Sequence, residues 1–168
     1  TYSYQWYSNT TNNTTTGTSL GASATSATYT PLTTALGTRY YYCIITQSGL
    51  GCGVTSAAVS VEVVAAPAVN TQPTPTQTVC LNGASTPLSI TLINGTGTPT
   101  YQWYSNTVNA LTGTAIAGAT SLSYVPPTSA TGTLYYYCIA TYNSGGCTTA
   151  TSNIAQVIVN PIQTITTQ

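Results

Sequence analysis

The chain has 168 residues with a single arginine, Arg39, a single glutamate, Glu62, and no lysine, aspartate or histidine. General acid–base catalysis, calcium binding and phosphate-backbone binding need titratable, acidic or basic side chains that this composition lacks. Zinc bound by cysteine alone needs four closely placed thiolates, whereas the five cysteines are spread from Cys43 to Cys147. We therefore expect no enzyme, cofactor, metal site or nucleic-acid partner. No apolar run reaches the ~18 residues that a membrane span requires.

One sequence pattern is written twice along the chain. Residues 4–10 read Tyr-Gln-Trp-Tyr-Ser-Asn-Thr and recur letter for letter at residues 101–107. A block Gly-Thr-x-Tyr-Tyr-Tyr-Cys ends at Cys43 and again at Cys138, and a Gly-Cys pair recurs at the same spacing. A unit of about 95 residues is therefore used at least twice.

The first copy, residues 1–66, is a partial unit. It starts at the tryptophan-bearing strand, so the counterparts of Cys80 and of a strand at 88–94 lie ahead of Thr1. A remnant of this size, with one side of its core uncovered, is marginal by itself. We expect residues upstream in a longer protein, or a strand from a neighbouring copy, to complete it.

The second copy, residues 67–161, is a complete unit rich in threonine, serine, glycine and tyrosine. A proline-rich lead-in precedes a stretch at 87–94 that alternates apolar residues with serine and threonine, as a strand with one buried face does. Further strands are expected at 100–106, 113–118, 120–125, 133–142 and 151–159. Short strands with frequent turns predict an all-β fold of tandem immunoglobulin-like antiparallel β-sandwiches. Residues 162–168 are expected to be a linker or the start of a further repeat.

These motifs resemble a known repeat type. The tryptophan strand and the Tyr-x-Cys ending at Cys138 match immunoglobulin-like domains. With Val-Cys-Leu-Asn-Gly at 79–83 and a closing Thr-Ser-x-x-x-x-Val-x-Val, nearly the whole chain resembles the Ig-like repeats of giant surface proteins of Bacteroidota. Those proteins leave the cell by type IX secretion and include gliding adhesins and cell-contact filaments. The resemblance implies an extracellular, cell-surface location, with neighbouring repeats and identical chains of a filament as partners.

The cysteines leave several pairings open. Export implies an oxidising compartment, in which disulfide bonds are expected. Similar repeats with two cysteines keep the counterparts of Cys80 and Cys147, Cys80–Cys138 would imitate the immunoglobulin bridge, and Cys138–Cys147 would close the last hairpin. Only the last choice has an equivalent, Cys43–Cys52, in the first copy. The immunoglobulin bridge cannot be assumed, because an apolar residue stands where its first cysteine would fall.

Strand alternation gives the tyrosine-rich strands two faces. The expected core residues are Trp6, Tyr41, Trp103 and Tyr136. The opposite face would carry a polar and aromatic patch, the candidate contact surface, formed by Gln5, Tyr7, Tyr40, Tyr42, Gln102, Tyr104, Tyr135 and Tyr137. Exposed tyrosines suit binding because the ring is rigid and its tip is polar. The patch could bind a surface glycan, pack against a parallel copy, or merely stabilise the sheet through cross-strand pairs.

The sequence therefore favours a structural and adhesive segment of a long extracellular surface protein, which makes contacts between a cell and a surface or another cell. Two alternatives remain open at this point. One is a carbohydrate-binding module of a secreted protein, and the other is a passive spacer that carries a distant tip domain.

Overall fold

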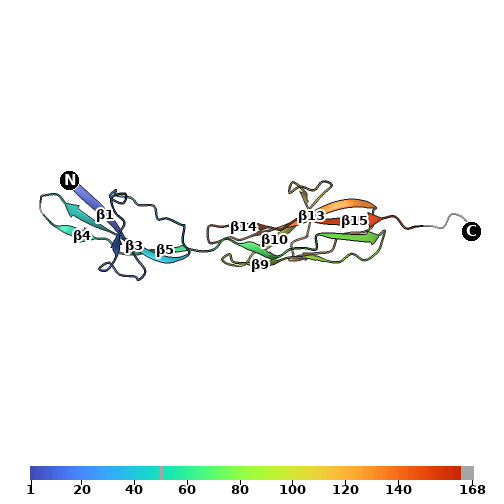
Figure 1. Ribbon diagram of the computed structural model, residues 1–168, viewed down its shortest axis with the longest axis horizontal. Coiled ribbons are helices and arrows are strands. Elements are labelled where there is room, and N and C mark those ends of the chain that lie inside the picture. Colours follow the sequence, from blue (N-terminus) through green and yellow to red (C-terminus); the bar gives the residue numbers. More distant parts are fainter. Residues whose placement is uncertain (50, 164–168) are drawn as a thin grey trace, which may run out of the picture. The chain divides into compact units, whose positions relative to one another are not determined.

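The computed structural model describes residues 1–49 and 51–163. Every regular element in these residues is a β-strand, so the predicted all-β fold class is confirmed. The chain divides into two compact units, Thr1–Val64 (unit 1) and Ala65–Gln168 (unit 2) (Figure 1). Most of the segment expected to link to a further repeat, 162–168, lies outside the described residues.

Unit 1 is built on a single antiparallel sheet with the strand order β2-β1-β3-β4, in which β5 also pairs with β3. Its strands are β1 (Tyr2–Asn9), β2 (Thr18–Ser19), β3 (Gly37–Gln47), β4 (Gly53–Thr55) and β5 (Val59–Val63). The long central pair places Trp6 opposite Cys43 and Tyr7 opposite Tyr42. Because opposite residues share a face, the tryptophan and the cysteine point to one side and the two tyrosines to the other.

Unit 2 repeats this sheet and adds a second layer. The main sheet has the order β11-β10-β13-β15-β7 with β14 paired to β13, and the ladders β12–β8 and β6–β9 lie outside it. Its strands are β6 (Ala68–Thr71), β7 (Thr76–Cys80), β8 (Leu88–Ser89), β9 (Thr91–Ile93), β10 (Thr100–Asn106), β11 (Thr114–Ala115), β12 (Ser123–Tyr124), β13 (Gly132–Thr141), β14 (Thr149–Thr151) and β15 (Ala155–Asn160). The two layers form an immunoglobulin-like sandwich.

The strand expected over 87–94 is split at Ile90 into β8 and β9. The backbone N–H of Ile90 donates a hydrogen bond to the Leu122 carbonyl at 3.2 Å. On either side of Ile90, β8 pairs with β12 and β9 pairs with β6. The chain thus changes partners halfway along one apolar stretch. Strand alternation locates such a stretch but says nothing about which neighbours it pairs with.

The core of unit 2 lies between its two layers and is centred on Trp103, which is 0% exposed. The core cluster around Trp103 contains Leu88 of β8, Ile90 directly after β8, and Tyr136 of β13. The inward residues of β15 complete this cluster. The indole Nε1 donates to the Ser121 carbonyl at 2.9 Å, so the buried polar atom is satisfied. Burying such large apolar surfaces is the main source of the stability of this unit.

Unit 1 has the same sheet but a thinner core. Trp6, which was expected to be a core residue, is only half-buried, although Tyr41 is buried. Val59 is 64% exposed, whereas Ala155 at the same place in unit 2 is 0% exposed. The reason is that the described residues of unit 1 contain no counterpart of the strands β7, β8 and β9.

The chain enters and leaves unit 2 at opposite ends (Figure 1). Ala68 in the first strand pairs with Ile93, and the next carbonyl, that of Asn94, accepts a hydrogen bond from the Tyr142 hydroxyl just beyond β13. The last strand ends at Asn160, at the opposite end of β13, where that strand begins. Force applied through the chain therefore acts along the strands.

Candidate functional site

The candidate contact surface is organised around stacked tyrosines. Tyr7 and Tyr42 face each other with ring centroids 5.3 Å apart and planes at 8°. Tyr104 and Tyr137 repeat the arrangement in unit 2 at 5.0 Å and 4°. Cross-strand aromatic pairs of this kind stabilise a sheet whether or not anything binds to them.

Two members of the surface, Tyr42 and Tyr137, are each only 2% exposed, which corrects their assignment as contact residues. Each hydroxyl accepts a hydrogen bond from a glycine backbone N–H, Gly17 at 3.2 Å and Gly113 at 3.0 Å. The loop that follows the tryptophan strand therefore folds back over the ring. Glycine permits this approach, because a Cβ at Gly17 would lie 2.6 Å from the Tyr42 hydroxyl oxygen.

The glutamines of the surface bind the backbone of their own unit. The Gln5 amide Nε2 donates to the carbonyls of Trp6 and Gly21. In unit 2 the Gln102 Nε2 donates to the Trp103 and Ile116 carbonyls, both at 2.8 Å. These side chains fasten the short edge strands β2 and β11 against the tryptophan strands.

The other residues of the candidate contact surface are half-buried, namely Gln5, Tyr7, Tyr40, Gln102, Tyr104 and Tyr135. Even the Tyr135 hydroxyl accepts a long hydrogen bond, 3.4 Å, from the Gln156 side chain. Among the three uses expected for this face, the geometry favours stabilisation of the sheet.

The cysteines form none of the expected disulfide bonds. Cys43, Cys80, Cys138 and Cys147 are free thiols, so none of the three pairings expected in unit 2 is formed, nor the one that would use Cys43. Strand register supplies the reason. Cys80 pairs with Asn160 and so lies beyond the first residue of β13, whereas Cys147 lies beyond the last residue of β13. Cys80 and Cys147 are therefore roughly 30 Å apart along β13. A disulfide needs Cα atoms within about 7 Å.

Cys138 lies partway along β13 with its thiol in the core, out of reach of both other cysteines of unit 2. Burial raises the pKa of this thiol to about 11, although a backbone hydrogen bond from Gln102 opposes the shift. Because the thiolate is the reactive form, this cysteine is a packing residue at neutral pH. The exposed thiols are Cys80 and Cys147, at opposite ends of the unit.

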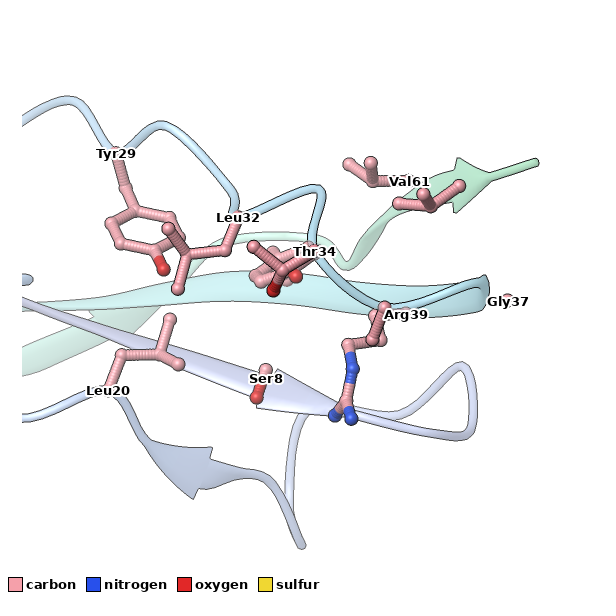
Figure 2. Close-up of a pocket in the computed structure, with 11 residues that line it drawn as sticks. Ser8, Leu20, Tyr29, Leu32, Thr34, Gly37, Arg39 and Val61 are labelled. Atoms are coloured by element: carbon pink, nitrogen blue, oxygen red, sulfur yellow. The ribbon is translucent and has the colours of Figure 1, made fainter. Parts of the chain in front are cut away.

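The inner face of unit 1 contains an open cavity of about 220 Å³ (Figure 2). Tyr29, Leu32 and Thr34 line it from the loop ahead of β3, and Leu20, Ser8 and Val61 line it from the sheet side. Tyr124, the counterpart of Tyr29 in unit 2, pairs instead with Leu88 of β8. Unit 2 nevertheless has an equivalent cavity of about 360 Å³, which Gly132, Tyr136 and Val157 line at the places of Gly37, Tyr41 and Val61.

No group of three or more His, Cys, Asp or Glu side chains that could hold a metal ion occurs in residues 1–49 and 51–163. No helix long and apolar enough to cross a membrane occurs in the same residues.

The sandwich of unit 2 and the matching sheet of unit 1 define an immunoglobulin-like β-sandwich protein. The chain belongs to the family described as "Domain of unknown function (DUF8696)", whose model matches residues 69–161, more than half of the chain. The matched range lies within unit 2. No curated protein matches the chain.

Solved structures similar to the chain are also β-sandwich modules. A PKD domain of human KIAA0319 has a TM-score of 0.44 at 12% identity, with 62% of this chain and 90% of that chain covered. Fibronectin(III)-like modules of Clostridium thermocellum CbhA have a TM-score of 0.42 at 16% identity, with coverages of 99% and 83%. The insect immune protein hemolin has a TM-score of 0.35 at 19% identity, with coverages of 73% and 29%.

Proposed function

We propose that the chain is a structural and adhesive repeat segment of a long extracellular surface protein, of the kind that Bacteroidota export by type IX secretion. It acts without catalysis, by holding successive units in a row and transmitting tension between a cell and what the cell contacts. Support comes from the duplicated unit, from the near absence of charged side chains, and from the motifs shared with such repeats.

The observation that carries this proposal is the pairing of the first long strand of unit 2 with its last strand. β7 and β15 run parallel, from Thr76 opposite Gln156 to Cys80 opposite Asn160. Hydrogen bonds of 2.8 Å extend the ladder at both ends, from Gln156 N–H to the Pro75 carbonyl and from Leu81 N–H to the Asn160 carbonyl.

Tension between the two ends of unit 2 pulls β7 and β15 in opposite directions along their axes. The bonds of a ladder loaded in this way share the force and must break together, whereas a ladder pulled open from one end loses them one at a time. Such a unit resists extension, which suits a filament or a stalk. Its partners would be neighbouring repeats and, in a filament, identical chains.

The carbohydrate-binding alternative depended on exposed tyrosines, and the burial of Tyr42 and Tyr137 removes two of its main candidates. A passive spacer for a tip domain would use the same mechanical design. It differs from an adhesive segment only in whether the repeats themselves touch a surface.

The proposal is tested by pulling the full chain from its two termini in single-molecule force spectroscopy. We expect one abrupt, high-force unfolding event whose length gain matches unit 2. Gradual extension at low force would contradict a mechanical role. A bead-retention assay distinguishes an adhesive segment from a passive spacer. Only an adhesive segment would hold chain-coated beads on a surface covered with polysaccharide or with the chain itself.

A further inference from the structure

The strand β7 forms an open edge of the main sheet of unit 2. Among the strands of residues 1–49 and 51–163, only β15 pairs with β7, and β7 ends the strand order of that sheet. At the opposite edge of the sheet lies β11, which is only 2 residues long. A very short edge strand gives other chains little to pair with, whereas β7 has 5 residues and lacks this protection.

The backbone groups of β7 point alternately to β15 and to the open edge. The Pro75 carbonyl accepts a hydrogen bond from β15 and the Leu81 N–H donates one to β15, both at 2.8 Å. Because alternate residues of a parallel strand point the same way, the N–H and C=O groups of Thr76 and Thr78 point instead to the open edge. Each of these threonines therefore offers one donor and one acceptor there.

The features that usually block an open edge are missing from β7. Natural edges are protected by charged side chains, or by a proline that removes an N–H group from the edge. The only charged side chains of the chain, Arg39 and Glu62, belong to unit 1. Pro75 directly precedes β7, but its backbone points to β15 and leaves the open edge intact. Nothing in β7 itself thus opposes pairing with another strand.

We propose that β7 is an interaction surface for a second copy of this chain, which adds its own β7 in antiparallel orientation about a two-fold axis. The edge complements itself, because Gln77 can lie opposite its own symmetry mate. Thr76 of each copy then lies opposite Thr78 of the other and exchanges main-chain hydrogen bonds with it. The turn after β7, in which Gly83 N–H donates to the Cys80 carbonyl at 2.8 Å, favours this register, since the pairing needs no group of Cys80.

The side chains of β7 suit such a pairing. Thr76 and Thr78 are exposed, and threonines on facing strands pair favourably. Gln77 is half-buried, and its amide accepts the Thr86 N–H at 2.8 Å and donates to the Thr86 carbonyl at 3.0 Å. Two copies can therefore meet at β7 without burying an unpaired polar side chain.

One pair of such strands makes a contact smaller than the roughly 1,000 Å² that a stable interface buries, so it should be weak. Many pairs along two chains of repeats add up to firm attachment. Because β7 runs along the unit, antiparallel pairing places the two chains in opposite directions. Filaments of two facing cells meet in this orientation, whereas filaments of one cell run the same way. This use in cell contact rests on the proposed function, but the pairing of β7 does not.

Sedimentation equilibrium of the full chain tests the pairing, with Cys52, Cys80 and Cys147 replaced by serine so that oxidation cannot join chains. We expect a reversible monomer–dimer equilibrium at chain concentrations up to about 1 mM. Thr78→Pro removes the N–H from the edge and should weaken the dimer about tenfold, whereas Thr78→Ala keeps this donor and should weaken it much less. Thr78→Lys should also prevent dimers by charge repulsion, and mixing it with Thr78→Glu should restore them.

Disulfide trapping in the same background tests the orientation. A Thr76→Cys chain mixed with a Thr78→Cys chain should cross-link in oxidised glutathione, because these positions lie opposite each other, whereas each variant alone should cross-link far more slowly. The proposal is overturned if the chain stays monomeric, if Thr78→Lys dimerises as well as the parent, or if either cysteine variant alone reacts as fast as the mixture. None of these results changes the unfolding force of unit 2, so they are independent of the mechanical role.

Discussion

Replacing each tryptophan by alanine compares the two units at one matched position. Trp103 and Trp6 sit opposite equivalent cysteines, stack on equivalent tyrosines, and donate equivalent hydrogen bonds. The two side chains differ in their exposure to solvent, since Trp103 is 0% exposed and Trp6 is half-buried. Trp103→Ala should therefore reduce the unfolding free energy of unit 2 by about 3–5 kcal/mol. Trp6→Ala should reduce that of unit 1 by about half as much, because half of the side chain already faces water.

The assay must separate the two units, because both contribute to any global signal. Hydrogen exchange followed by mass spectrometry gives an opening free energy for peptides from β3 and from β13 separately. Each substitution should affect its own unit only. An equal loss at the two positions would refute the view that unit 1 has the thinner core, and so would a larger loss for Trp6→Ala.

Three smaller effects follow from the same structure. Tyr137→Phe removes the acceptor of the Gly113 N–H and should destabilise unit 2 by about 1 kcal/mol in urea unfolding, whereas Tyr135→Phe, with only a 3.4 Å bond, should change it little. Thiol labelling of the folded chain at pH 8 should modify Cys80 and Cys147 and spare Cys138, and rapid labelling of Cys138 would contradict its burial. Because the folded-state pKa of Cys138 is raised from 9.0 to about 11, the unfolded state loses this proton first as the pH rises. Its contribution to stability should therefore be present below pH 9 and be lost between pH 9 and 11, and Cys138→Ala should remove that part of the dependence.

Much of the fold follows from local patterns in the sequence. Alternation along the tryptophan strand and along the Tyr-Tyr-Tyr-Cys strand separates the inward Trp103 and Tyr136 from the outward Tyr104 and Tyr137. That separation is a property of two neighbouring residues and needs no knowledge of the rest of the chain.

What local patterns miss are the contacts between distant segments. An outward residue is exposed only if nothing folds back over it, and Tyr137 is covered by a loop 24 residues away in the sequence. The sequence does contain one signal of this covering loop. Gly17 and Gly113 recur in the two copies at the place where a tyrosine ring approaches the backbone. Disulfide pairing fails for a similar reason. Counting cysteines does not reveal that β7 runs parallel to β15 and carries Cys80 to the end of unit 2 opposite to Cys147.

A matched pair of substitutions at Leu81 tests the mechanical claim most directly, because its backbone N–H closes the β7–β15 ladder at 2.8 Å. Leu81→Pro removes that donor, while Leu81→Ala keeps it and removes only the side chain, which packs against the core. In single-molecule pulling through the chain termini, we expect Leu81→Pro to lower the unfolding force of unit 2 clearly more than Leu81→Ala does. Equal forces for the two variants would show that the parallel ladder does not carry the tension.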